Sequence, residues 1–334
     1  MKDKGYNFIR FVGTLLIVLW HYCSTSIDLK LPILYGKDLL RRGNIGFATV
    51  GVGIFFILSG ALLHHNYKDK LDIKSFYKKR LVRIYIPIFI SYIFLFGLTY
   101  IFNPSIIHFR KISILLSFFG LDFFGELLWN TIHVGTLWLV GEWFTTVILI
   151  IYLLFPLLRK LFIKHFYLTT IIISIIFLIN LKVEFLTYGN GYYSITNGIM
   201  YFWIGMIFDK YKDYIKKYIF IPIIICLLLL IINPKDIFGF WYLYIFIFSA
   251  SIFIILYQIK ISNKFIDYIC KYNYDIYLLH HRIFIIVMPL ILVNCKSISQ
   301  LLLAFIFINL LVCVTSEKLN LISNKISNKI LMRR

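Results

Sequence analysis

Ten apolar runs, most of them near bilayer length, recur along this chain of 334 residues. A helix needs about 20 predominantly apolar residues to cross the ~30 Å hydrocarbon core of a membrane. One soluble core could not bury so many runs, and only 15% of the residues are charged, whereas soluble domains carry about 25%. The sequence therefore predicts an all-α membrane protein, a bundle of about ten transmembrane helices.

Turn residues or charges separate the predicted spans, such as Asn103-Pro104 after the third and Asn233-Pro234 after the seventh. The stretch 112–129 is also partly apolar, but it holds acidic residues that include Asp122. We interpret it as an interfacial segment within a solvated loop. We expect a single membrane domain over residues 1–334. Its predicted spans are roughly 8–25, 45–65, 84–102, 136–158, 166–181, 193–209, 218–232, 238–257, 274–293 and 298–316.

Basic residues are distributed unequally between the two sets of loops. With the N-terminus inside, 25 of the 35 Lys and Arg lie on the cytoplasmic side, 9 lie outside, and Arg282 lies within a span. This asymmetry is the positive-inside pattern, and it predicts that the N- and C-termini are both cytoplasmic. It also accounts for the net charge of +20, so we expect no nucleic-acid partner. The five cysteines lack metal-ligand spacing, so we expect no metal.

Ionisable residues inside a predicted span are candidates for function because charge is costly in lipid. The first span carries Arg10 and His21, eleven residues apart. In an α-helix this spacing is close to three full turns, so both side chains share a face and lie roughly 16 Å apart along the axis. We place Arg10 at the cytoplasmic mouth and His21 in the outer third of the membrane. A snorkelling arginine and a structural, hydrogen-bonded histidine are the alternative interpretation.

A carboxylate in the predicted fourth span, Glu142, is expected at a depth similar to that of His21. It lies six residues after the predicted start at Thr136, about 9 Å below the outer surface, and Trp138 lies four residues earlier on the same face. Facing lipid would be too costly, so we expect Glu142 in the bundle interior. A His–Glu pair holds an imidazole in one tautomer for proton transfer, and a purely structural bond between helices is the alternative.

Two arginines stand at the entry of the predicted third span. Arg80 and Arg83 are three residues apart and would lie on one face of a helical turn. Paired guanidiniums suit bidentate capture of phosphate. A positive-inside loop that touches lipid headgroups explains the neighbouring lysines well, but it explains Arg83 less well.

The predicted ninth span carries Tyr277 and two adjacent histidines, His280 and His281. Counted from Tyr274, His280 lies about 9 Å inside the span. Because adjacent residues on a helix point in different directions, we expect at most one of the two imidazoles to face a cavity.

Four glycines mark the predicted second span: Gly46, Gly51, Gly53 and Gly60. Small residues at such spacing let helices approach closely. We interpret them as packing positions, and backbone room for a ligand is the alternative.

These segments resemble the acyltransferase-3 family of integral membrane O-acyltransferases, in motifs spread over nearly the whole chain. The most specific is an arginine followed after ten residues by a histidine in the first span. The matching segments are Arg10 with His21, the stretch from Gly51 to Gly60, the Arg-x-x-Arg pair Arg80 and Arg83, the run from Leu137 through Trp138 and Glu142 to Leu158, and Tyr277 to His280.

The resemblance implies transfer of an acyl group, most often acetyl, from acyl-CoA to a hydroxyl of a surface polysaccharide or glycolipid, by a multi-pass protein of the plasma membrane. It carries His21 over as the residue essential for transfer. From the positions of the charges, we expect His21 to act as general base on the acceptor hydroxyl, with Glu142 orienting it. Arg10, Arg80 and Arg83 become donor-side residues. We also assign His280 to the acetyl-CoA side, and Trp138 and Tyr277 to substrate binding. Spacing does not distinguish direct transfer from an acyl-histidine intermediate.

A transporter or flippase of glycan precursors is the best alternative from another functional class. Buried charges within about ten spans suit such a protein. Transporters, however, often consist of matching halves with interrupted helices, and the sequence shows no such repeat. The polar residues concentrate instead in the first four predicted spans and the ninth, which favours the enzyme.

Overall fold

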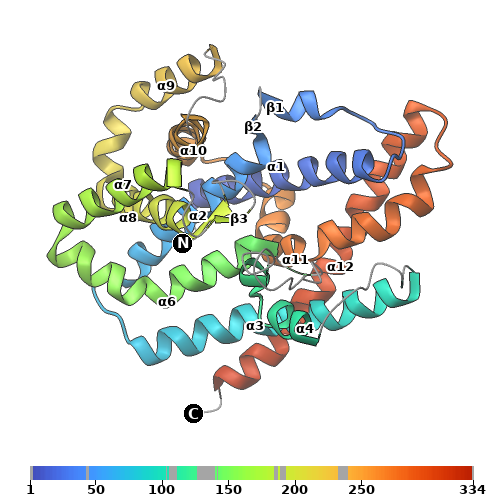
Figure 1. Cartoon of the computed structure of the whole chain (residues 1–334), viewed down its shortest axis with the longest axis horizontal. Coiled ribbons are helices and arrows are strands. Elements are labelled where there is room, and N and C mark those ends of the chain that lie inside the picture. The colour runs from blue at the N-terminus through green and yellow to red at the C-terminus, as the bar shows by residue number, and fades with distance from the viewer. Residues whose placement is uncertain are drawn as a thin grey trace. The chain divides into compact units, whose positions relative to one another are not determined.

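Long α-helices dominate the computed structural model, which describes residues 3–42, 45–102, 104, 111–125, 140, 142–183, 187–188, 193–231 and 240–332 (Figure 1). Within these ranges, eight helices are long and apolar enough to cross a membrane. They are α1 (Lys4–Asp28), α2 (Phe47–Tyr67), α3 (Ile73–Phe102), α6 (Glu142–Lys164), α7 (Phe166–Val183), α10 (Phe240–Gln258), α11 (Lys264–Leu292) and α12 (Ile298–Met332).

A ninth crossing is possible where α8 (Ile195–Lys217) meets α9 (Phe220–Ile231). The two helices are bent by 97° and together pass the test of length and hydropathy. The described part of the chain thus has eight or nine spans where the sequence predicts about ten, because 193–209 and 218–232 form this bent pair. With 12 residues, α9 is about 18 Å long and too short to cross the hydrocarbon core alone.

The remaining elements are short. They are the 3₁₀ helix η1 (Lys37–Leu40), α4 (Lys111–Phe118), and two antiparallel pairs of two-residue strands, β1 (Arg41–Arg42) with β2 (Ile45–Gly46) and β3 (Thr187–Tyr188) with β4 (Tyr193–Ser194). The strands precede α2 and α8 and form no layer of their own, so the all-α membrane class predicted from the sequence is confirmed.

Several helices extend beyond their predicted apolar runs. The third helix begins at Ile73, not near 84, and therefore carries Arg80 and Arg83 within its first turns. The last helix runs to Met332 and spans about 52 Å, more than the ~30 Å hydrocarbon core. Hydropathy marks only the part of a helix that suits lipid, whereas the backbone hydrogen bonds continue into polar residues.

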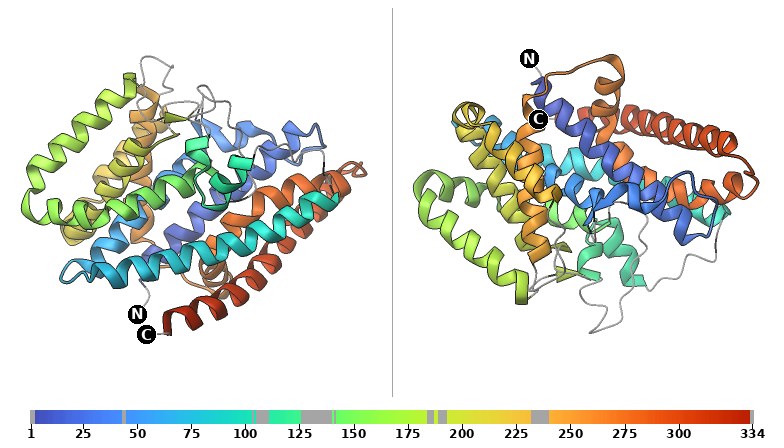
Figure 2. Two further views of the ribbon diagram at one scale, coloured as in Figure 1. Left: turned by 60° about the horizontal axis from the view of Figure 1, so that its bottom comes forward. Right: turned by 90° about the horizontal axis from the view of Figure 1, so that it is seen from above.

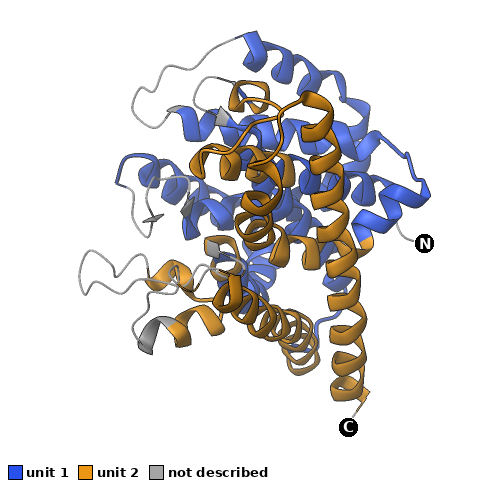
Figure 3. Ribbon diagram, turned by 90° about the vertical axis from the view of Figure 1, so that its right-hand side faces the viewer, with its two compact units in different colours: residues 1–17, 41–73, 147–270 blue, residues 18–40, 74–146, 271–334 orange. Residues whose placement is uncertain are grey.

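Two compact units divide the chain (Figure 3). Unit 1 comprises residues 1–17, 41–73 and 147–270, and unit 2 comprises residues 18–40, 74–146 and 271–334. The helices α1, α6 and α11 each contribute residues to both.

A close contact between α2 and α8 forms the centre of unit 1. A Cβ atom on Gly60 would overlap the backbone carbonyl of Phe202, and one on Gly205 would overlap that of Ile57. A Cβ atom on Gly53 would come within 2.8 Å of the Tyr201 ring on α8 and 2.9 Å of the Ser249 hydroxyl on α10. Gly53 and Gly60 therefore serve helix packing, in line with the first interpretation of the glycine pattern.

In unit 2, α11 has α3 and α12 as neighbours (Figure 2). The Tyr274 hydroxyl donates a hydrogen bond of 3.3 Å to the Ile84 carbonyl of α3. On the α12 side, Asn320 donates to Asp275, at 2.8 Å. These contacts fix α11, which carries the two adjacent histidines.

Candidate active site

Arg10 and His21 lie on the continuous helix α1, eleven residues and about 16 Å apart along its axis. The Arg10 guanidinium, which is half-buried in unit 1, donates a hydrogen bond of 2.9 Å to the side-chain oxygen of Asn7. The Asn7 backbone carbonyl accepts a hydrogen bond from the Cys270 thiol, also at 2.9 Å. No carboxylate forms an ion pair with Arg10 among the described residues, so its positive charge is not neutralised by one of them.

Three imidazoles meet in unit 2. The half-buried His21 ring lies edge-on against His280 and His281, with ring centroids 5.1 Å and 4.6 Å apart. The His280 Nδ1 lies 2.9 Å from the Ile276 carbonyl and 3.0 Å from that of Tyr277. Because carbonyls only accept hydrogen bonds, Nδ1 carries the proton, and a neutral His280 has its lone pair on Nε2.

Both histidines of α11 thus contact His21, although the sequence suggests that at most one would face the site. Adjacent helical positions differ by about 100°, so a group that approaches between the two directions touches both. The sequence analysis assigned a role only to His280 because it did not consider a ring that lies between the two directions. Within the described ranges, no group of three or more His, Cys, Asp and Glu side chains is arranged to hold a metal ion.

Aromatic rings hold this end of α1 in place. Tyr22, next to His21, packs edge-on against Phe284 of α11 and Phe305 of α12, with centroids 5.4 Å and 4.9 Å away. After α1 the chain folds back, and the Tyr35 hydroxyl donates to the Leu19 carbonyl at 2.9 Å. The position of His21 is therefore fixed by packing on both of its neighbouring helices.

The first turn of α6 also reaches this part of unit 2. The hydroxyls of Thr145 and Tyr277 are 3.2 Å apart, and the Phe144 ring lies edge-on to Tyr277 at 5.3 Å. Glu142 is the first residue of α6, whereas the sequence predicted it six residues into a span that begins at 136. Its side chain lies outside the described residues. Trp138 also lies outside them.

The two arginines at the entry of the third span lie on one helix, as their spacing predicts. Arg80 is half-buried, and its guanidinium stands over the Phe76 ring at 5.7 Å from the centroid. Arg83 is exposed. The hydrogen bond from Tyr274 to Ile84 joins α11 to α3 one residue beyond Arg83. An exposed and a half-buried guanidinium three residues apart suit a phosphate ligand.

Sequence reasoning missed a buried carboxylate in unit 1. Asp209 of α8 is 6% exposed and accepts hydrogen bonds from Tyr6 at 3.2 Å, His64 at 2.7 Å and Lys212 at 3.0 Å. His65 lies 3.3 Å from it. It is the last residue of the predicted span 193–209, beside a lysine-rich segment, and the buried face of α8 extends to it. The cluster joins α1, α2 and α8.

A second carboxylate, Asp122, contradicts its assignment to a solvated loop. It is fully buried and accepts a short hydrogen bond from Ser117. Close by, the Thr146 hydroxyl donates to the Gly120 carbonyl at 2.7 Å and accepts from the backbone N–H of Phe123 at 3.3 Å. Gly120 has a φ of 65°, which glycine adopts without strain, and this turn folds the segment back onto α6.

One comparison with known proteins gave a result. The model of the acyltransferase-3 family, described as an acyltransferase domain, matches residues 3–317, nearly the whole chain and parts of both units. No curated protein and no solved structure matches the chain. Since the family match covers far more than half of the residues, and since the chain has at least eight helices fit to cross a membrane, the protein belongs to the acyltransferase-3 family and is a multi-pass membrane acyltransferase.

Proposed function

We propose that this protein is an O-acyltransferase that moves an acyl group, most simply acetyl, from acyl-CoA to a hydroxyl of a surface polysaccharide or glycolipid. It does so as a single acyltransferase domain in the plasma membrane, with both termini in the cytoplasm. The observation that carries the proposal is the half-buried imidazole of His21 against His280 and His281 in a chain of this family.

His21 acts as the general base. One ring nitrogen accepts the proton of the acceptor hydroxyl while the hydroxyl oxygen attacks the thioester carbonyl. The new C–O bond forms, the C–S bond breaks, and the departing thiolate takes the proton from His21. Glu142 orients the imidazole, and Trp138 and Tyr277 bind the substrate. The contact between Tyr277 and Thr145 supports this grouping, because Thr145 follows Glu142 by three residues on α6.

The donor is bound by Arg10, Arg80, Arg83 and His280. CoA carries phosphates, and guanidiniums bind phosphate with two parallel hydrogen bonds. The guanidinium groups suit such a ligand, since Arg10 has only the neutral Asn7 amide as its described polar partner and Arg83 is exposed. A neutral acceptor molecule would gain little binding energy from these guanidinium groups.

Release of CoA thiol from acetyl-CoA by purified protein, in the presence of acceptor glycan, tests the proposal. We expect His21→Ala to lower the rate by about 10²-fold or more, the usual contribution of a general base. His165→Ala serves as the matched control, because His165 is exposed and lies between α6 and α7. A His21→Ala variant that folds and releases thiol at the wild-type rate contradicts the assignment. A transporter would release no thiol at all.

A further inference from the structure

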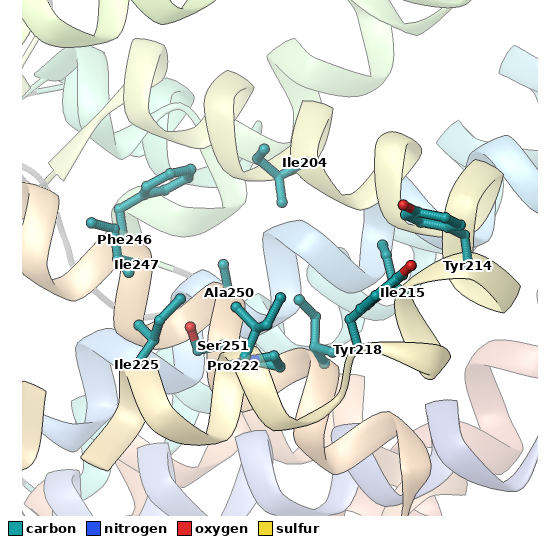
Figure 4. Close-up of a pocket in the computed structure, with 12 residues that line it drawn as sticks. Ile204, Tyr214, Ile215, Tyr218, Pro222, Ile225, Phe246, Ile247, Ala250 and Ser251 are labelled. Atoms are coloured by element: carbon teal, nitrogen blue, oxygen red, sulfur yellow. The ribbon is translucent and has the colours of Figure 1, made fainter. Parts of the chain in front are cut away.

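An apolar groove in unit 1 has no part in the proposed reaction. It lies where α8, α9 and α10 meet and has a volume of about 530 Å³ (Figure 4). Its walls are almost entirely aliphatic and aromatic, with Ile204 and Ile215 from α8, Pro222 and Ile225 from α9, and Phe246 from α10. Ligand pockets commonly measure about 300–1,000 Å³, so the space suits a molecule rather than a single water.

The 97° bend between α8 and α9 opens this groove. The short helix α9 turns away at Tyr218, so it covers α10 without closing onto the length of α8. The outer side of α9 exposes large apolar side chains, among them Ile224, Leu228 and Ile231. In a membrane protein such a surface faces hydrocarbon, so lipid chains have direct access to the groove.

One end of the groove is polar. Tyr214 and Tyr218 lie side by side there, with ring centroids 5.0 Å apart (Figure 4). Lys216 and Lys217 do not line the groove, but they stand beside this end on the last turn of α8 and are exposed. Among the described residues, neither ammonium group nor either phenol hydroxyl has a hydrogen-bond or ion-pair partner. With Asp213 as the exposed carboxylate of the same turns, the surface beside this end carries a net positive charge.

We propose that this groove binds an anionic membrane phospholipid. One acyl chain lies along the apolar walls, the two tyrosine hydroxyls donate to the phosphate at the polar end, and the exposed ammonium groups of Lys216 and Lys217 attract its negative charge from beside the groove. Basic residues beside a membrane attract anionic headgroups, and tyrosines gather at the level where headgroup and hydrocarbon meet. Along α8, the groove therefore offers an apolar region that suits an acyl chain, followed by a polar end that suits a headgroup.

The chemistry of the groove favours a lipid over a helix from a second copy of the chain. An apolar helix face would match the aliphatic walls but leave the tyrosine hydroxyls and the neighbouring lysines without a partner, whereas an anionic phospholipid complements both parts.

Photo-crosslinking of the wild-type protein tests the proposal. Phosphatidylglycerol with a diazirine in its acyl chain is added to the protein in detergent, and the labelled peptides are identified by mass spectrometry. We expect label to concentrate in 204–225 and 246–254, and unlabelled phosphatidylglycerol to displace it about tenfold better than phosphatidylcholine with the same chains. Label spread evenly over lipid-facing helices such as α7, equal competition by the two lipids, or cross-links between two copies at this groove would overturn it.

Two variants separate the headgroup from the chain. Lys216→Gln with Lys217→Gln should remove the preference for phosphatidylglycerol, whereas the exposed control pair Lys325→Gln with Lys329→Gln on α12 should keep it. Ala250→Trp fills the groove from α10 and should abolish labelling by either lipid. Retained labelling in folded Ala250→Trp protein excludes this groove. If Ala250→Trp does not fold, the labelled peptides of the wild-type protein still show whether the lipid enters this groove.

Discussion

At the scale of single residues, the proposed catalysis depends on how the His21 ring is held. Its ring contacts His280 and His281 at once, and His280 is in turn fixed by two carbonyls of its own helix. Catalysis by a general base depends on placing its nitrogen within hydrogen-bond reach of the reacting proton. Residues that only touch the His21 ring should therefore affect the rate.

His281 offers a test of that argument. Removing its ring with His281→Ala leaves space beside His21, so the imidazole can shift. Misplacement of about 1 Å can cost about 10²-fold in rate, so we expect the turnover number to fall tenfold or more while the melting temperature changes by only a few degrees. Thiol release and thermal unfolding measure the two effects. An unchanged turnover number would show that His281 does not position the base.

Asp209 predicts a different kind of effect, on stability. Asp209→Asn leaves Lys212 without its buried counter-charge and removes the carboxylate partner of His64, and breaking a buried ion pair from one side costs about 3–5 kcal/mol. We expect a markedly lower melting temperature in detergent. Asp213→Asn, four residues along the same helix but exposed, is the matched control and should be nearly neutral. Equal effects of the two changes would contradict a structural role of the buried cluster.

Spacing on a single helix is what the sequence reveals at this scale. It placed Arg80 beside Arg83 and singled out His21, Tyr277 and His280, which the structure brings together in unit 2. It did not reveal Asp209 or Asp122, because their burial depends on partners far away along the chain. A carboxylate near lysines or in a half-apolar segment resembles a solvated one until its hydrogen-bond partners are known.

At the scale of elements, the contact between α2 and α8 depends on glycine. A methyl group on Gly60 would overlap the Phe202 carbonyl, and backbone cannot move aside as a flexible side chain can. We expect Gly60→Ala to destabilise the protein by about 1–3 kcal/mol or more. Gly97→Ala on α3 is the control, since a Cβ there meets nothing, and it should be neutral or stabilise by up to about 1 kcal/mol. Thermal unfolding of the two variants compares them directly, and equal stability would contradict the close contact.

The start of α1 is tied to α10 by a carboxylate. Burial alone would raise the pKa of Asp3, but hydrogen bonds from Tyr257, Lys260 and the Gly5 backbone outweigh it and lower the pKa below the usual 3.8. A lowered pKa in the folded state stabilises the protein above the unfolded-state value, and this stability is lost as the pH falls through the folded-state value.

The direction of this pKa shift predicts how the effect of Asp3→Asn on stability depends on pH. The variant should unfold at a temperature lower by roughly 2 °C at pH 7, because Asp3 is partly exposed and its contribution is small. The difference should shrink as the pH falls from about 4 through the lowered pKa of folded Asp3, because the wild-type carboxyl then becomes neutral, like the asparagine side chain. Thermal scans at several pH values measure it. A difference in unfolding temperature that persists unchanged at pH 3 would mean that the carboxylate charge of Asp3 does not cause it.

Hydropathy predicted most helices but not their ends. Runs such as 8–25 and 274–293 correspond to α1 and α11, and in each case the helix continues into polar residues where backbone hydrogen bonds, not lipid, decide its length. The bend between α8 and α9 was not predicted, because a change of direction leaves the apolar content of both segments intact.

At the scale of the whole molecule, the number of crossings decides where the termini lie. With the eight other spans of the described residues, counting α8 and α9 as one crossing puts the two termini on opposite faces, whereas counting them as two or as none puts both on the same face. The count of 25 basic residues inside against 9 outside assumes the ten crossings predicted from the sequence, and it favours both termini inside.

Labelling with a membrane-impermeant maleimide tests this topology. In a cysteine-free background, Lys30→Cys should be labelled in intact cells, whereas Lys70→Cys and Lys325→Cys should be labelled only after the cells are opened. All three lysines are exposed in the structure, so access to the thiol depends on the side of the membrane. Labelling of Lys325→Cys in intact cells would show an odd number of crossings.

The most direct test of the account follows the acyl group itself. Membranes that contain the wild-type protein are given acetyl-CoA labelled in the acetyl group, and the label is then sought as a base-labile ester on the polysaccharide or glycolipid fraction. We expect ester in the wild-type membranes and in those with His165→Ala, and none above background with His21→Ala. Equal ester formation by folded His21→Ala protein would contradict catalysis by His21.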